Sequence, residues 1–147
     1  MDIGAKCGYP ASSLSNFAPH VFNMDGVEIR SMEGFLQSLK FSNFEMAKEV
    51  CKLVGRAAKF KGKKKRWQVS QELYWNNVTY KRDSDEYQSL LLRAYTEMTK
   101  QNIRFREALH ASGNARFTHS LGRNKINDTV LTEREFCSLL HQMRSKL

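Results

Sequence analysis

Residues 31–41 read SMEGFLQSLKF, and their spacing predicts an amphipathic helix that begins after Ser31 as the N-cap. At about 100° per residue, one face carries the apolar side chains that pack on a core, namely Met32, Phe35, Leu36 and Leu39. Glu33, Gln37 and Lys40 form a second line beside that face. A carboxylate, an amide and an ammonium at the edge of a buried face are well placed to border a pocket. The same spacing also suits a solvated surface with a weak ion pair, so the pattern leaves both interpretations open.

The composition is that of one globular domain covering residues 1–147. Hydrophobic residues make up 41% of the chain and include nine Phe, five Tyr and two Trp, which is enough for a single core. There is no internal repeat and no low-complexity linker.

Neither a membrane nor an oxidising compartment is expected. No apolar run is long enough to cross a bilayer, and the first residues, MDIGAKCGYPASS, lack the apolar region of a cleaved signal. The three cysteines show no CxxC spacing, which argues against a disulfide framework or a zinc site. The four histidines have no ligand spacing and no Gly-rich phosphate loop is present, so neither a metal nor a cofactor is expected. We therefore expect a cytoplasmic protein, in the host cytoplasm if the chain is viral.

The charge favours an anionic partner. Lysine and arginine outnumber aspartate and glutamate by 24 to 15, which gives a formal charge of +9. Six of the basic residues crowd the stretch from Lys59 to Arg66. That stretch is interpreted either as a mobile loop or as a phosphate-attracting lip beside a pocket, which could also contact DNA or RNA. Trp67 follows it directly and could stack on a base or belong to the core.

The remaining pattern predicts an α+β fold that is mostly helical. The Asp25-Gly26 pair between two short apolar runs predicts an N-terminal β-hairpin. Two helices are expected in the first half of the chain: one over residues 45–54, with Met46 inward and Gly55 as its stop, and one over residues 67–74 that ends near Asn76-Asn77. Three more are expected in the second half. One follows a capping box of Asp83 and Glu86, one runs from Asn102 to Gly113, and one follows a capping box of Thr132 and Glu135. Residues 115–119 are predicted as a short strand.

Several blocks in order resemble the NADAR, or YbiA-like, family of N-glycosidases. Leu14-Ser15-Asn16-Phe17 resembles the family's Ser-Asn-Phe motif, and Asp25-Gly26 resembles its hairpin turn. The helix at residues 31–41 resembles the family's Glu-His-Tyr-Phe-Gln-Ala-Gln-Lys-Phe segment and keeps Glu33, Gln37, Lys40 and Phe41. Gly55-Arg56, Trp67, residues 105–109 and residues 139–144 fit the later blocks. The resemblance implies a single compact NADAR/YbiA-like domain.

One region departs from the family pattern. Family members carry an Asp, a Trp and a Gly-rich loop containing Asn before the last helix. Here residues 118–128 keep Gly122 and Asn124 but no Trp. Asp128 or His119 could stand in for the missing acid.

The resemblance implies cleavage of a bond between a ribose carbon and a base nitrogen, in ADP-ribosylated guanine or in a phosphorylated riboflavin-pathway intermediate. Glu33 is then the carboxylate that stabilises an oxocarbenium-like state or positions water. Lys40 would hold a phosphate or attack the opened sugar as an amine, and Asp128 would be the second acid. Contacts to the substrate are assigned to Asn16, Phe17, Gln37, Arg56, Trp67 and His119.

Two other functions remain open. The first is a module that binds ADP-ribose or a nucleotide without turning it over, since the loop that carries the family's acid is altered. The second is a basic protein that binds nucleic acid through residues 59–66, with an affinity that falls steeply with salt.

Overall fold

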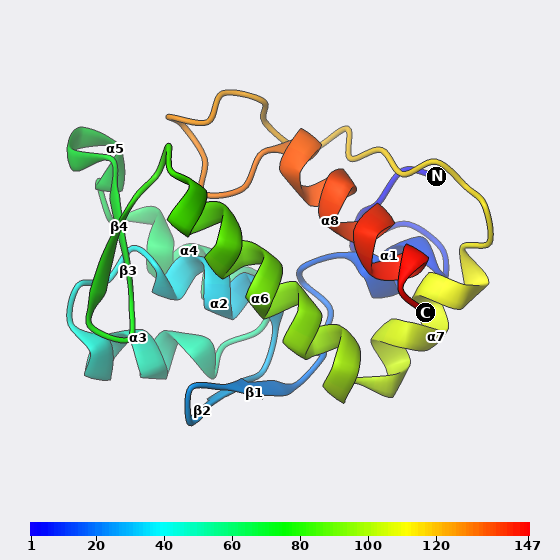
Figure 1. Cartoon of the computed structure of the whole chain (residues 1–147), viewed down its shortest axis with the longest axis horizontal. Helices are drawn as coiled ribbons and strands as arrows, with labels where there is room; N and C mark the ends of the chain where they lie inside the picture. Colours follow the sequence, from blue (N-terminus) through cyan, green and yellow to red (C-terminus); the bar gives the residue numbers. More distant parts are fainter.

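The computed structural model describes all 147 residues (Figure 1). Its helices are α1 (Ala11–Leu14), α2 (Met32–Ser38), α3 (Phe44–Cys51), α4 (Gly55–Lys63), α5 (Trp67–Ser70), α6 (Asp85–Gln101), α7 (Ile103–Ala111) and α8 (Glu133–Ser145). Its strands form two separate antiparallel hairpins, β1 (Phe22–Met24) with β2 (Val27–Ile29), and β3 (Glu72–Trp75) with β4 (Val78–Lys81). The predicted α+β class, mostly helical with a small N-terminal hairpin, is confirmed.

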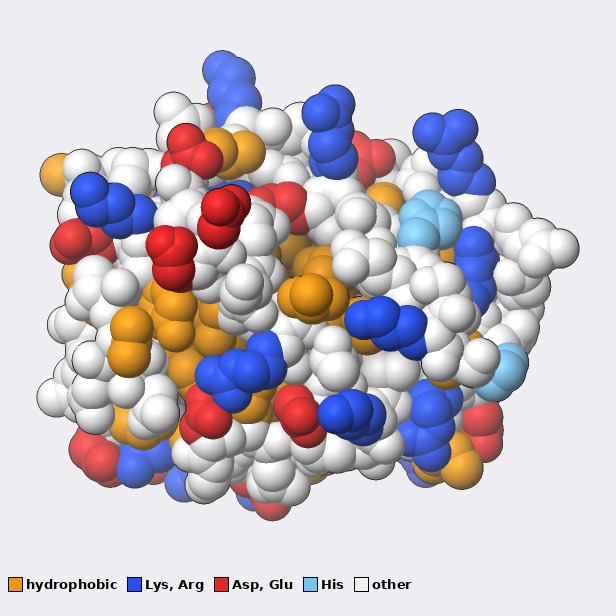
Figure 2. Space-filling view, in the orientation of Figure 1, with side chains coloured by type: hydrophobic (Ala, Val, Ile, Leu, Met, Phe, Trp, Pro, Cys, Tyr) orange, Lys and Arg blue, Asp and Glu red, His pale blue; other side chains and the backbone are white.

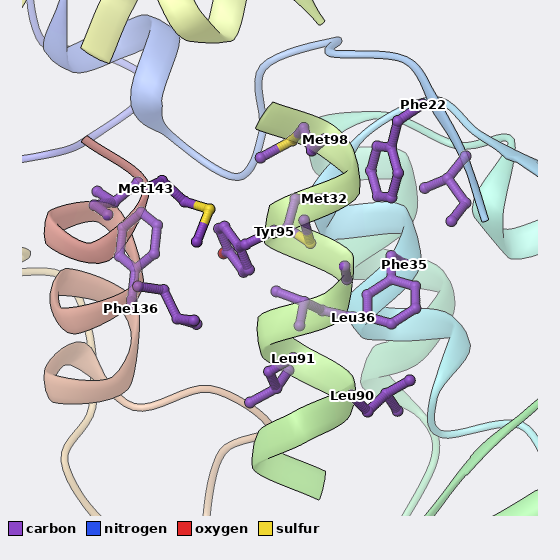
Figure 3. Close-up of a cluster of buried hydrophobic side chains, with 14 of the residues drawn as sticks. Phe22, Met32, Phe35, Leu36, Leu90, Leu91, Tyr95, Met98, Phe136 and Met143 are labelled. Atoms are coloured by element: carbon purple, nitrogen blue, oxygen red, sulfur yellow. The ribbon is translucent and has the colours of Figure 1, made fainter. Parts of the chain in front are cut away.

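Helix α6 lies at the centre of the molecule. It passes between α2 and α8, and its side chains point to both sides (Figure 3). Leu90 faces Phe35 and Leu36 of α2, whereas Leu91 and Tyr95 lie toward Phe136 of α8. These residues belong to one continuous core of 30 buried side chains that runs from Ile3 to Met143. The apolar stripe predicted for residues 31–41 is therefore part of this core.

The first hairpin forms as predicted. Phe22 pairs with Ile29 and Met24 with Val27, so the turn has two residues, Asp25 and Gly26, which both adopt positive φ angles, of 53° and 76°. The Asp25 carboxylate accepts two hydrogen bonds from Arg93 of α6, at 2.9 and 2.8 Å, and one from Trp75 Nε1 at 2.7 Å. The turn thus ties the hairpin to the centre of the molecule.

The second hairpin replaces a predicted helix. Residues 67–74 were expected to be helical, but α5 ends at Ser70, and β3 and β4 follow. Asn76 and Asn77 form the two-residue turn, again with positive φ angles of 51° and 64°. Leu73 and Trp75 are buried while their neighbours are half-exposed, which is the alternation of a strand. The helix prediction for this segment is wrong because four residues are too few to distinguish the two periods.

The region between α2 and α5 also differs from expectation. Helix α3 ends at Cys51, and Met46 is 47% exposed rather than inward. Gly55 does not stop that helix but opens α4, with a φ of +59° that favours glycine. Residues 59–63 are therefore helical, so the expectation of a loop is wrong for this part of the basic stretch, whereas Lys64, Lys65 and Arg66 connect α4 to α5.

Helices α6, α7 and α8 bury the apolar residues that the sequence predicts, and their N-caps lie at or within one residue of the predicted positions. The cap of α6 is Ser84 rather than Asp83, whereas Asn102 caps α7 and Thr132 with Glu135 forms a complete capping box on α8. Residues 115–119 form no strand; the segment makes only a single bridge, between Thr118 and Asp2.

A buried ion pair joins β4 to α8 through the residue that follows the strand. The Arg82 side chain has 0% exposure, and its guanidinium donates to both carboxylate oxygens of Glu135, at 3.1 and 2.6 Å. Arg82 Nε also donates to the Thr129 carbonyl at 2.8 Å, and the guanidinium lies over the Tyr87 ring. All three guanidinium nitrogens thus have an acceptor, as a buried charge requires.

No helix of the structure combines the length and the apolar character that a membrane span needs.

Candidate functional site

Helix α2 is held at its start by its predicted cap. Ser31 Oγ accepts from the Gly34 N–H at 3.0 Å and donates to the Leu53 carbonyl at 2.9 Å. The helix ends at Ser38, and tighter turns continue the chain to Phe41. Since the apolar stripe is buried, the line of Glu33, Gln37 and Lys40 takes the adjacent flank, as the sequence predicts.

A short hydrogen bond links the first two members of that line. Gln37 Nε2 donates to Glu33 Oε2 at 2.6 Å. The second carboxylate oxygen, Oε1, has no protein partner and is not sealed from solvent. Gln37 is only 7% exposed, and its own Oε1 is buried without a partner. The amide of Gln37, which was expected to contact a substrate, thus also orients the Glu33 carboxylate.

The backbone of α4 forms the wall opposite this flank. The inward positions of α4 are Gly55, Ala58 and Gly62, which allow the helix to come close to α2. Lys40 Nζ reaches the Gly62 carbonyl at 3.5 Å, and a Cβ at Gly62 would overlap Gln37 Oε1. Three small residues thus set the distance between the two helices that enclose the polar line.

The segment before the first hairpin anchors Glu33. The Asn16 carbonyl accepts from the Glu33 N–H at 2.9 Å, and Asn16 Oδ1 accepts from the Tyr95 hydroxyl at 2.6 Å. The Asn16 Nδ2 group has no protein partner, so it remains free to donate to a ligand. Tyr95 is buried in the middle of α6, which fixes the position of Asn16. Sequence reasoning missed Tyr95, because nothing in α6 distinguishes it from the other core residues.

Two further side chains, Lys59 and His119, influence the Glu33 carboxylate electrostatically. Lys59 comes from α4, and His119 comes from the loop that departs from the family pattern; both act on the charge of Glu33. His119 Nδ1 lies 2.7 Å from the Ile3 carbonyl, to which it can only donate, and its ring packs edge-on against Phe136. Its Nε2 has no protein partner and is free to exchange a proton with a ligand. His119 was predicted to lie at the site; Lys59 was predicted only as part of the basic stretch.

The protein environment moves the pKa values of the Glu33 carboxyl and the Lys40 ammonium toward each other. Burial raises the pKa of the Glu33 carboxyl. The hydrogen bond from Gln37 and the charges of Lys40, Lys59 and His119 lower that pKa, but burial outweighs them. Burial lowers the pKa of the Lys40 ammonium, Lys59 lowers it further, and Glu33 opposes both. A carboxyl and an amine that are both destabilised in their charged forms are typical of a site for proton transfer or nucleophilic attack.

Arg56 and Phe17, two further residues that were predicted to contact the substrate, both lie near Gly55, where α4 begins. Arg56 is exposed in the first turn of α4 and makes no ion pair, so its guanidinium is available to an anion. Phe17 lies against Gly55 and lines a surface hollow of about 320 Å³ that also contains His20 and Arg104. A second hollow, of about 370 Å³, lies between α6 and α8 on the face shown in Figure 2.

Two predicted site residues are placed elsewhere. Trp67 is 4% exposed and belongs to the core, so it has no face free to stack on a base. Asp128 is exposed on the loop before α8, where its backbone bonds to Gln68 and Lys125 while its carboxylate makes no hydrogen bond. Of the two candidates for the missing acid, His119 is the one that the fold brings to Glu33.

No group of three or more His, Cys, Asp or Glu side chains could hold a metal ion. The polar line has one carboxylate, one amide and one ammonium, and Lys59 of α4 adds a second cation near it, which is a set suited to an anionic organic ligand.

The Gly62→Ala variant tests the close approach of α4 to α2. The added methyl group would displace Gln37 from Glu33, so we expect the free energy of unfolding to fall by about 1–3 kcal/mol. Thermal and chemical unfolding measure it. Gly8→Ala is the matched control, because nothing lies within 4 Å of the Cβ it would add. Wild-type values for Gly62→Ala would show that the two helices are not closely packed.

Comparison with known proteins places the chain in a family. The family model described as "Bacteriophage protein GP30.3" matches residues 8–145. A curated relative from Enterobacteria phage T4, "Uncharacterized 17.1 kDa protein in Gp30-rIII intergenic region", is 38% identical over 149 residues, covering 100% of this chain and 98% of the relative.

A solved structure shares the fold. The NMR structure of the E. coli protein YbiA is similar with a TM-score of 0.60 over 93% of this chain and 78% of YbiA, at 17% identity. The resemblance inferred from the ordered sequence blocks is thus confirmed at the level of the fold. The chain belongs to the bacteriophage protein GP30.3 family and has the YbiA fold.

Proposed function

We propose that this protein is an N-glycosidase that hydrolyses the bond between a ribose carbon and a base nitrogen. The observation that carries the proposal is the enclosed line of Glu33, Gln37 and Lys40, in which burial pushes the pKa values of acid and amine toward each other. A binding pocket for a phosphate or ribose alone does not need a carboxyl with a raised pKa. The substrate class proposed is an ADP-ribosylated guanine or a related phosphorylated ribosyl-amine.

Glu33 has the central role in this mechanism. As the base nitrogen leaves with the bonding electrons, the ribose carbon becomes positively charged, and the carboxylate stabilises that charge. Its free Oε1 also accepts a proton from the attacking water, for which a raised pKa is favourable. Gln37 holds the other oxygen and so keeps Oε1 directed at the substrate.

Lys40 and His119 serve as the remaining groups. The protonated form of Lys40 contacts a phosphate. In an alternative to direct attack by water, its neutral amine, which the lowered pKa favours, adds to the former anomeric carbon of a ring-opened ribose. The bond from that carbon to the base nitrogen then breaks as the base takes up a proton, and water hydrolyses the resulting imine to regenerate the amine. His119 donates its Nδ1–H to a backbone carbonyl, so its Nε2 faces the departing base and gives it a proton from the imidazolium form of the ring. Arg56 and the free amide of Asn16 are assigned to phosphate and ribose.

The membership in a bacteriophage family suggests where the reaction takes place. We assign the activity to the cytoplasm of an infected cell, where nucleotides and nucleic acids are both accessible.

The deciding experiment is release of ADP-ribose from an oligonucleotide that carries ADP-ribosylated guanine. Release by the parent protein and not by Glu33→Gln would support the proposal. Free ADP-ribose bound by the parent without any release would favour a binding module that has lost turnover. If neither release nor binding occurs, phosphorylated riboflavin-pathway intermediates are tested next, and failure with these as well would overturn the N-glycosidase assignment.

A further inference from the structure

The outer face of α4 is basic, and its charges have no acidic partners. Between Glu49 and Glu72 the sequence contains no acidic residue. All seven Lys and Arg side chains from Arg56 to Arg66 are exposed, and none takes part in any of the five ion pairs of the structure. The face in Figure 2, by contrast, mixes acidic with basic side chains. An uncompensated cluster of this size attracts a polyanion.

A large aromatic ring lies exposed among these charges. Phe60 is 65% exposed, although a phenylalanine is normally buried in the core. Lys64 Nζ lies 5.6 Å from the centre of its ring. Since Arg56, Lys59, Phe60 and Lys63 follow the spacing i, i+3, i+4 and i+7, they share one face of the helix.

We propose that this face of α4 binds a single-stranded nucleic acid, with Phe60 stacked on an unpaired base and the neighbouring cations on its phosphates. The face from Arg56 to Lys63 extends over about 10 Å at 1.5 Å per residue, which is enough for about three phosphates. An exposed aromatic side chain within a basic surface is the arrangement that single-strand binders use. A duplex offers no unpaired base to Phe60 and is therefore bound more weakly.

The surface is continuous with the candidate site. Lys40 Nζ lies 3.5 Å from the carbonyl of Gly62 on α4, directly before Lys63 of the basic face, and Lys59 of the same face also acts on the charges of Glu33 and Lys40. A strand held on α4 would thus place one of its nucleotides beside the Glu33 carboxylate. This last step rests on the proposed function, whereas binding to α4 does not.

The test uses a labelled, unmodified single strand of about 12 nucleotides, within the range of known site sizes, and fluorescence anisotropy over a series of salt concentrations. Because the probe carries no ADP-ribosyl group and the anisotropy reports formation of the complex rather than release of a product, the measurement of binding does not depend on glycosidase activity. Phe60→Ala is expected to weaken binding by about 5- to 100-fold at every salt concentration, without changing the salt dependence. Phe60→Trp is expected to keep the parent affinity.

The cations are tested separately. Lys63→Gln with Lys64→Gln is expected to reduce the slope of log affinity against log salt by about 1.4, since each phosphate contact on a single strand contributes about 0.7. Lys100→Gln with Lys146→Gln is the charge-matched control, and Ile103→Ala, at a side chain that is 60% exposed, is the control for Phe60→Ala. Thermal unfolding confirms that each variant is folded.

Three outcomes would overturn the proposal. They are absence of binding at low salt, equal affinity for the strand and its duplex, and the same loss of affinity for Phe60→Ala as for Ile103→Ala.

Discussion

Glu33→Gln is expected to lower turnover of an N-ribosyl substrate by about 10³- to 10⁴-fold while the protein stays folded. The amide has the same shape as the carboxylate, and its oxygen can still accept the hydrogen bond from Gln37 Nε2. It cannot accept a proton from water, and it does not stabilise a positive ribose carbon. Rates under saturating substrate, together with the melting temperature, separate the loss of chemistry from a loss of structure.

The same variant should gain stability relative to the parent as the pH rises. Burial raises the pKa of Glu33 above its ordinary value of 4.5, so the folded state binds the proton more tightly than the unfolded state does. Ionisation therefore costs stability in the parent as the pH rises from about that value to the higher pKa of the folded state. The amide introduced by the substitution does not titrate, and the gap in unfolding free energy between the variant and the parent should widen over this range.

Asn16→Ala serves as a comparison, because it removes the side-chain hydrogen bond with Tyr95 that positions Asn16, while the Asn16 carbonyl and the Glu33 carboxylate both remain. A Glu33→Gln protein with normal turnover would remove the central residue from the mechanism.

Glu135→Ala is expected to lower the free energy of unfolding by about 3–5 kcal/mol, because it leaves the Arg82 guanidinium buried without a counter-charge. The variant also breaks the capping box of α8, in which Glu135 Oε1 accepts from the Thr132 N–H at 2.8 Å. For a chain of this length the loss corresponds to a melting temperature lower by about 10–15 °C. Chemical denaturation and thermal unfolding measure it.

The control is Glu45→Ala, which removes the carboxylate of an exposed pair with Lys48 at 2.8 Å. An exposed pair contributes at most about 1 kcal/mol, so this variant should unfold close to the parent. Equal losses in the two variants would show that the Arg82–Glu135 pair is no more important than a surface pair.

The pair also has a pH signature. Burial opposes ionisation of Glu135, but the hydrogen bonds from Arg82, Thr132 and Gln88 outweigh it and hold the pKa of that carboxyl below 4.5. A lowered pKa contributes stability above that value, and the contribution is lost as the pH falls through the pKa of the folded state.

Local sequence patterns predicted the elements of the fold that are marked by a long periodic stretch or by a specific residue motif. The stripe of α2, the Asp25-Gly26 turn and the capping box of α8 each combine several positions that agree. The second hairpin was missed because its strands have only four residues and its Asn76-Asn77 turn also suits the end of a helix. The helical state of residues 59–63 was missed because its inward face has only Gly and Ala, which carry little apolar signal.

From spacing alone, the candidate site could be predicted only where its residues share one helix, and Asn16 and His119 were added by the family resemblance. Glu33, Gln37 and Lys40 follow from spacing, but Tyr95 and Lys59 come from other helices, and their approach depends on packing between α2, α4 and α6. Asp128 and His119 looked equivalent in the sequence. The contacts of His119 with Ile3 and Phe136 distinguish the two residues, and these contacts cannot be predicted from a local pattern because the partners are distant in the sequence.

The packing of α4 through Gly55, Ala58 and Gly62 has a consequence for the thermodynamics of recognition. A mobile basic loop would have to become ordered when it binds, at about 1–2 kcal/mol for each backbone residue. A helix already held against α2 is preorganised and avoids that entropic penalty. The backbone positions that carry its cations are also fixed relative to α2, so the register of a bound strand would be set by the protein before the ligand arrives.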